Sequence, residues 1–256
     1  MPYIERAGAR LYYETHGHKV GTAPALVFAH GAGGNHLSWW QQVPHFRGRY
    51  SCVVFDHRGW GLSSAEPDGS QFVDDLRALL DHLEIERATL VAQSMGGWTS
   101  LGFAMRWPER VERLALCDTH GGISSPEIDG VWKASAENAT KLPAGVHPAI
   151  GERMYREQPG LAFLYEEIDA LNAVTRPQMF AAIQAAGTVP ALEAAKLTVP
   201  VLFVIGEEDI VIAPPFLEAA ARAVPGARVE RIPEAGHSVY FERAERFNAA
   251  IDAFLG

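Results

Sequence analysis

Cysteine is scarce in this chain: Cys52 and Cys117 are the only two among 256 residues. Both lie in apolar runs that are typical of strands, so we expect buried thiols in a reducing compartment rather than a disulfide. Two isolated cysteines are too few for a zinc site, and we predict neither a metal nor a cofactor.

Basic residues and long apolar runs are also under-represented. Lys and Arg number 22 against 31 Asp and Glu, which gives a formal net charge of −9. This charge disfavours nucleic acid and anionic membranes as partners, because both require basic patches. No run of 18 apolar residues is present, and residues 1–6 lack the apolar segment of a secretory signal. We therefore expect a cytoplasmic protein, with both a monomer and a homo-oligomer left open.

What the chain does contain is an alternation of strand and helix patterns. Hydrophobic residues make up 48% of it, enough to bury a full core. Strands are predicted at 3–7, 10–16, 25–30, 50–56, 88–92, 111–117, 200–205 and 228–232. Helices are predicted within 39–46 and at 72–83, 95–107, 215–223 and 242–255. This order predicts an α/β fold with a mostly parallel sheet covered by helices on both faces.

The alternation is interrupted once. From about Gly121 to about Pro190 no strong apolar strand occurs, and helical patterns with proline and glycine breaks dominate. We predict that residues 122–190 form a helical cap inserted between a first part of the core, 1–121, and a second part, 191–256.

The most informative stretch is residues 89–97. An apolar run ends at Val91 and leads through Ala92-Gln93-Ser94-Met95-Gly96 into a helix-capable segment. A serine at such a strand-to-helix turn has its hydroxyl pushed out of the backbone, ready to attack a carbonyl. Ala92 stands where the G-x-S-x-G pattern has its first glycine, and it still allows strand and helix to approach closely. The alternative is an ordinary serine at a helix N-cap.

A serine nucleophile needs a base and a third group that orients the base. In a parallel sheet these groups should follow later strands, in the order serine, acid, histidine. Asp209 follows the strand predicted at 200–205, and His237 follows the last strand. Among ten histidines, His237 is the only one that comes after both Ser94 and Asp209. Three other carboxylates stay open for the acid role: Asp118, Glu207 and Glu208.

The reaction also needs backbone N–H groups that stabilise the developing oxyanion. One is expected from Met95, the residue after the nucleophile, and the other from Ala32 in the glycine-rich loop 30–34. That loop lacks the Gly-Lys-Ser/Thr of a P-loop, and its glycine spacing does not fit a dinucleotide fingerprint.

Taken together, these motifs resemble the α/β-hydrolase fold family over nearly the whole chain. The segments that carry the resemblance are His30–Gly34, Asp56–Ser63, Ala92–Gly97, Gly206–Asp209 and Gly236–Ser238. The resemblance implies Ser94 as nucleophile, His237 as general base and acid, and Asp209 as the orienting acid. It also implies a helical cap over the site.

For function, the resemblance implies a serine hydrolase. The expected partner is a small-molecule substrate, a small to medium, mostly neutral carboxylic ester or lactone, cleaved through an acyl-enzyme on Ser94. Acyl-homoserine lactones and enol-lactones are examples. The alternatives are a carbon–carbon bond hydrolase of vinylogous diketones with the same triad, and a slow-turnover ligand receptor. Epoxide and haloalkane hydrolases of this fold use an aspartate where this chain has Ser94, so those reactions are not expected.

Candidate substrate-binding residues come from the loops beside the motifs and from the predicted cap. They are Gly31, Trp39, Trp98, His120, Tyr155 and Leu164, with Asn138 as a further candidate. Their apolar and aromatic character favours a pocket for an acyl or aromatic group. The alternative is that these side chains simply pack on the core.

Overall fold

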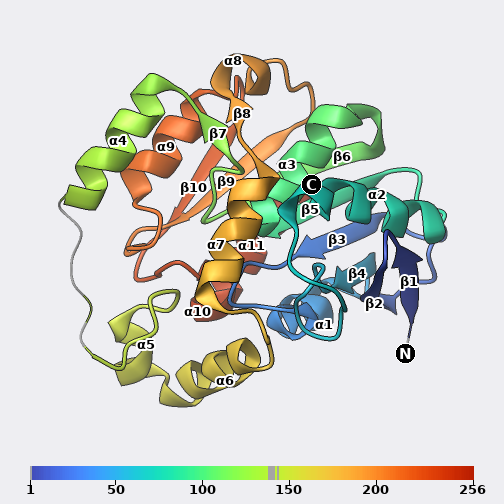
Figure 1. Cartoon of the computed structure of the whole chain (residues 1–256), viewed down its shortest axis with the longest axis horizontal. Helices are drawn as coiled ribbons and strands as arrows, with labels where there is room; N and C mark the ends of the chain where they lie inside the picture. The colour runs from blue at the N-terminus through green and yellow to red at the C-terminus, as the bar shows by residue number, and fades with distance from the viewer. Residues whose placement is uncertain (1, 138–141, 143) are drawn as a thin grey trace.

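A computed structural model of the chain describes residues 2–137, 142 and 144–256. Its main strands are β1 (Tyr3–Arg6), β2 (Ala9–Gly17), β3 (Ala25–Ala29), β4 (Ser51–Phe55), β5 (Ala88–Gln93), β6 (Val111–Cys117), β9 (Val201–Gly206) and β10 (Arg228–Ile232). They form one eight-stranded sheet in the order β1-β2-β4-β3-β5-β6-β9-β10 (Figure 1).

Most of this sheet is parallel, as predicted. β1 and β2 pair in antiparallel fashion, β2 is antiparallel to β4, and the strands from β4 to β10 run parallel. Every residue of β3, β4, β5 and β9 is buried, which explains why these strands are continuous apolar runs rather than alternating ones. The predicted strands at 200–205 and 228–232 join the early strands in the same sheet, because β9 pairs with β6.

Helices cover both faces of the sheet. Val27 and Ala29 of β3 belong to one buried cluster and Leu26 and Phe28 to another, so successive residues face opposite layers. On the first face lie α2 (Phe72–His82), α3 (Gly96–Arg106) and α9 (Pro214–Arg222). On the second face lie α1 (Gln42–Phe46) and α11 (Ala244–Leu255).

Between β6 and β9 the described chain leaves the main sheet. It forms β7 (Ile123–Ser124), α4 (Pro126–Glu137), α5 (Glu152–Glu157), α6 (Pro159–Ala170), α7 (Arg176–Ala186), β8 (Val189–Pro190) and α8 (Ala191–Ala194). β7 and β8 pair with each other, Ile123 opposite Val189, and bring the two ends of this segment together. The sequence does not predict this pairing, because two residues are too few to show a strand period. The cap boundaries at 122 and 190 stay a prediction.

Helix α7 lies over the carboxyl ends of β3 and β5 and crosses in front of the sheet in Figure 1. Its Ala182, Met179 and Ile183 pack in an apolar cluster that also contains Met95 and Ala32. Helix α7 also packs closely on Gly69, where a Cβ would stand 1.9 Å from the carbonyl oxygen of Ala182. This helix therefore covers the two residues whose N–H groups are expected to bind an oxyanion.

One helix prediction is confirmed and another differs in detail. The helix expected within 39–46 is α1 (Gln42–Phe46), which follows a 3₁₀ turn, η1 (His36–Trp39). The last helix, expected from residue 242, is two helices, α10 (Val239–Glu242) and α11, because Arg243 between them has a non-helical backbone (φ −132°, ψ 53°). Cys52 and Cys117 are free and buried, as predicted. Across residues 2–137, 142 and 144–256, every helix is too short or too polar to cross a membrane.

Candidate active site

Ser94 follows β5 at a sharp turn into α3, and its backbone is in the left-handed region, with φ +46°. The turn brings strand and helix very close together. A Cβ on Gly96 would stand 2.3 Å from the carbonyl oxygen of Ala29, and one on Gly97 would stand 2.3 Å from Oγ1 of Thr119. Only glycine fits at these two positions, which is why the Ser-Met-Gly-Gly sequence folds as a turn that presents the serine side chain.

Two later loops bring a histidine and a carboxylate to this serine. Ser94 Oγ lies 2.8 Å from Nε2 of His237, and Nδ1 of His237 lies 2.8 Å from Oδ2 of Asp209. The other Asp209 oxygen accepts hydrogen bonds from the N–H groups of Val211 and Ile212, at 2.8 and 2.9 Å. Since Nδ1–H must donate to the carboxylate, Nε2 is left to accept the serine proton. The three side chains form one continuous hydrogen-bonded chain.

The alternative acids lie elsewhere. Glu207 and Glu208 are exposed and form ion pairs with Arg231 and Arg153, at 3.1 and 2.6 Å. Asp118 is fully buried, but its oxygens accept backbone N–H groups instead of contacting the His237 ring.

Asp118 connects the two loops that carry Asp209 and His237. One of its oxygens accepts the N–H of Gly206, at 2.8 Å, and the other accepts the N–H of Val239, at 3.2 Å. Burial, together with the nearby Asp209 charge, raises the pKa of the Asp118 carboxyl well above its ordinary value. Asp118 therefore holds the loop after β9 and the His237 loop together by hydrogen bonds inside the protein.

The His237 loop has two more supports that sequence reasoning missed. The buried Glu242 carboxylate accepts the N–H groups of Gly236 and Ser238, at 3.1 and 3.3 Å, so it holds the residues on both sides of His237. Burial raises the pKa of the Glu242 carboxyl. Gln93 donates from Nε2 to the carbonyl oxygen of His237, at 2.8 Å. An acidic residue directly after the apolar Val-Tyr-Phe run 239–241 was the available signal for Glu242.

The glycine-rich loop at the end of β3 is oriented through its first carbonyl. The Gly31 oxygen accepts hydrogen bonds from Nδ1 of His30, at 2.7 Å, and from the N–H of Gly34, at 3.0 Å. In a trans peptide the next N–H points the opposite way, so these bonds fix the direction of the Ala32 N–H. Throughout the described chain, the N–H groups of Ala32 and Met95 have no acceptor. Both are free to bind an oxyanion.

A second histidine, His57, fixes the tautomer of His30. The N–H of His57 donates to Nε2 of His30, at 2.9 Å, so that nitrogen is an acceptor and Nδ1 carries the proton. Burial lowers the pKa of His30 to about 4, so its ring is neutral at pH 7. The Trp60 ring nitrogen donates to the Ala32 carbonyl at 2.8 Å and fixes the other side of the loop.

Among the candidate substrate-binding residues, Gly31 lies directly beside Ser94. A Cβ on Gly31 would stand 3.0 Å from Cβ of Ser94. Trp39 is fully buried, with its ring centroid 5.0 Å from that of Phe28 and 4.7 Å from that of Tyr240. Trp39 therefore lies in the core that packs on the second face of the sheet.

The other candidates lie in two groups. Trp98 packs edge-on against His120, with ring centroids 4.6 Å apart, and burial lowers the pKa of His120 to about 4. Tyr155 accepts the His147 N–H through its hydroxyl, at 2.9 Å, and Leu164 is half-buried against the core of the second face. Asn138 lies outside the described residues.

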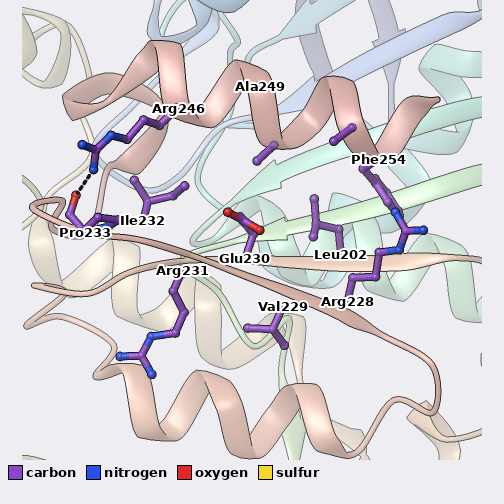
Figure 2. A pocket seen from close by; sticks show the side chains of 12 residues that line it. Leu202, Arg228, Val229, Glu230, Arg231, Ile232, Pro233, Arg246, Ala249 and Phe254 are labelled. Carbon is purple, nitrogen blue, oxygen red and sulfur yellow. Dashed lines mark hydrogen bonds between the residues drawn. The ribbon is translucent and has the colours of Figure 1, made fainter.

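A surface groove of about 760 Å³ lies away from these groups, between β10 and α11 (Figure 2). Arg228, Arg246, Leu202 and Phe254 are among its lining residues, and Arg246 donates to the Pro233 carbonyl at 3.4 Å. Ser94, His237 and Asp209 do not line it, so it is not part of the site. In the part of the chain that the structure describes, no three His, Cys, Asp or Glu residues are grouped as a metal site would require.

Comparison with known proteins gives a consistent result. The model of a family described as the alpha/beta hydrolase family matches residues 26–250. The chain is 28% identical over 245 residues to 3-oxoadipate enol-lactonase 2 of Acinetobacter baylyi, covering 91% of this chain and 88% of the relative. It superimposes on the crystal structure of the enol-lactonase from Burkholderia xenovorans LB400 with a TM-score of 0.82, 29% identity and 99% coverage of both chains. Est816, an N-acyl homoserine lactone degrading enzyme, gives a TM-score of 0.79 at 25% identity, covering 99% of this chain and 100% of that one.

Proposed function

Because the chain belongs to the alpha/beta hydrolase family, we propose that it is a serine hydrolase that cleaves a small to medium, mostly neutral carboxylic ester or lactone. The family and the fold were predicted from the motifs and are confirmed by the family match and the superposition. The observation that carries the proposal is the hydrogen-bonded chain from Ser94 through His237 to Asp209, with both distances at 2.8 Å.

In the first half of the proposed reaction, Ser94 Oγ attacks the carbonyl carbon while its proton moves to Nε2 of His237. The Asp209 carboxylate keeps the ring in the right tautomer and stabilises the imidazolium that forms. The oxyanion accepts hydrogen bonds from the N–H groups of Ala32 and Met95, each worth about 3 kcal/mol in the transition state. His237 then gives its proton to the leaving oxygen, and an acyl-enzyme remains.

In the second half, water attacks the acyl-enzyme. His237 accepts a proton from the water, the oxyanion forms again between the same two N–H groups, and the proton passes to Ser94 Oγ as the acid leaves. When the substrate is a lactone, the first half opens the ring, and the alcohol remains part of the acyl group, so this step releases one hydroxy acid.

The proposed substrate class rests on the site's surroundings and on the relatives. Met179 and Ile183 of α7 pack against Met95 and Ala32, so the region beside the oxyanion donors is apolar. An apolar wall suits the carbon chain or ring next to a carbonyl. Two relatives are named as enol-lactonases and one as an enzyme that degrades acyl-homoserine lactones, which supports esters and lactones of this size.

The test is turnover of a short substrate panel by the wild type and by Ser94→Ala. The panel contains p-nitrophenyl esters of increasing acyl length, an acyl-homoserine lactone and a vinylogous diketone. We expect turnover of an ester or lactone, and a loss of about 10⁴-fold or more in Ser94→Ala. Ser100→Ala is the matched control, because Ser100 is buried in α3 and its hydroxyl has no partner among the described residues.

Near-normal turnover by Ser94→Ala would overturn the proposal. Cleavage of the diketone alone, dependent on Ser94, would replace it with carbon–carbon bond hydrolysis. We further propose that the enzyme works in the cytoplasm, since the two unpaired buried thiols, Cys52 and Cys117, suit a reducing compartment.

A further inference from the structure

We infer that Gln93 is a positioning residue whose side-chain amide sets the distance between the base His237 and the nucleophile Ser94. The inference rests on the proposed function and adds a residue to it. Gln93 is the last residue of β5, directly before Ser94, and its side chain is buried. It is not part of the Ser94–His237–Asp209 chain and touches no reacting atom, so its effect must act through its neighbours.

The N–H side of the amide holds the base. Gln93 Nε2 donates to the carbonyl oxygen of His237 at 2.8 Å, although the two residues are 144 positions apart in the chain. Within the described residues, it is the only hydrogen bond that this carbonyl accepts. The bond links the backbone of the base directly to the residue that adjoins the nucleophile.

The carbonyl side of the same amide lies against the glycine-rich loop 30–34, called here the oxyanion loop because it carries the Ala32 N–H. A Cβ on Gly31 would stand 1.9 Å from Oε1 of Gln93 and 3.0 Å from its Cδ. The Gly31 backbone therefore rests directly on the amide, and the next peptide carries the Ala32 N–H. One side chain thus contacts the segments that supply the nucleophile, the base and an oxyanion donor.

The other supports of the His237 loop cannot replace this bond. Glu242 belongs to the same segment of chain as His237, so it shapes the loop without fixing it to the serine. Asp118 joins Val239 to Gly206 at the end of β9, and it reaches the nucleophile turn only indirectly, through the carbonyl oxygen of the preceding Cys117, which accepts the Ser94 N–H at 3.0 Å. Gln93 is the support that joins the His237 backbone in a single hydrogen bond to the residue adjoining Ser94.

The experiment separates the donor from the volume of the side chain. Gln93→Met keeps a similar length and removes the N–H donor. Gln93→His restores a donor, because a ring N–H reaches about as far as the amide N–H. Thr89→Val is the matched control, since Thr89 is a buried polar residue of the same strand, at its other end. For each variant we would measure kcat and KM, the melting temperature, and the rate at which a fluorophosphonate labels Ser94.

We expect Gln93→Met to lower kcat and the labelling rate by about 10- to 100-fold with KM changed less than about threefold, since small misplacements of reacting groups cost this much. Gln93→His should recover most of the loss, and Thr89→Val should keep the wild-type rates. A purely structural role would lower the melting temperature and leave kcat and labelling unchanged.

Two results would overturn the inference. The first is a Gln93→Met variant that keeps kcat and labelling within about twofold of wild type. The second is an equal loss in Gln93→Met and Gln93→His, which would assign the effect to volume instead of the donor. Neither affects the proposed function, which fails separately if Ser94→Ala keeps its turnover.

Discussion

Gly31 and Gln93 are packed so closely that a methyl group on Gly31 would stand 1.9 Å from the side-chain oxygen of Gln93. Real Cβ atoms do not approach an oxygen to this distance, so the position accepts only glycine unless the amide moves. The need for glycine at position 31 is therefore imposed by Gln93, a residue 62 positions later in the chain.

Gly31→Ala is expected to displace the Gln93 amide or the oxyanion loop. We predict a fall in kcat/KM of about 100-fold and a loss of about 1–3 kcal/mol in the free energy of unfolding from overpacking. Steady-state kinetics and urea denaturation check both. Gly48→Ala is the control, because Gly48 is exposed with open space around it. Wild-type kinetics in Gly31→Ala would contradict the close contact.

The left-handed backbone at Ser94 predicts a difference between two inactive variants. Ser94→Ala and Ser94→Gly both remove the hydroxyl, but only glycine adopts φ +46° without steric cost. We expect Ser94→Gly to be more stable than Ser94→Ala by about 1 kcal/mol. Thermal unfolding of the two proteins measures this directly. Equal or lower stability of the glycine variant would mean that the turn is not strained in solution.

Glu242 is predicted to support both stability and rate. Its replacement in Glu242→Ala leaves the buried N–H groups of Gly236 and Ser238 without acceptors, which should cost about 2–4 kcal/mol of unfolding free energy. The turnover should fall as well, because His237 lies between these two residues. Urea denaturation and kcat measurements check the two effects. Glu245→Ala, an exposed glutamate of α11, should change neither.

Buried histidines predict a loss of stability in acid. Burial lowers the pKa of His120 from 6.5 to about 4, so the unfolded chain binds a proton in this pH range that the folded chain does not. Unfolding is then favoured as the pH falls from about 6.5 to about 4, and the contribution is fully present above 6.5. Each such group changes stability by up to about 1.4 kcal/mol per pH unit in the window.

The variant His120→Asn isolates this contribution, because its amide can still donate to the Ile123 carbonyl as Nδ1 of His120 does. Between pH 7 and pH 4.5 we expect it to lose about 1–2 kcal/mol less unfolding free energy than the wild type. Parallel curves for His120→Asn and wild type would show that His120 titrates normally.

The sequence was sufficient to locate the sheet, and it singled out three residues, Ser94, Asp209 and His237, whose side chains the structure joins by hydrogen bonds. Buried parallel strands such as β5 and β9 are continuous apolar runs, so they stand out without any knowledge of their neighbours. Ser94, Asp209 and His237 each follow such a strand. The expected order along the chain is serine, acid, histidine, and only one histidine, His237, comes after Asp209. This order left a single candidate for the base.

The supporting residues could not be found in this way. Gln93 and His237 are 144 residues apart, and a hydrogen bond over that separation has no local pattern. Asp118 was recognised as a carboxylate after a strand, but only the structure shows that its oxygens accept hydrogen bonds from backbone N–H groups. Residue type alone also placed Trp39 among the substrate-binding candidates, whereas its environment is the core.

Ser94 and His237 are separated by 143 residues, and this order has a consequence during protein synthesis. A ribosome that adds about 5–20 residues per second makes Ser94 roughly 7 to 30 s before His237. Under the proposed function the hydroxyl lacks its proton acceptor throughout that interval and would react no faster than an ordinary alcohol. The growing chain would thereby be protected from acylation by cellular esters until His237 has been made.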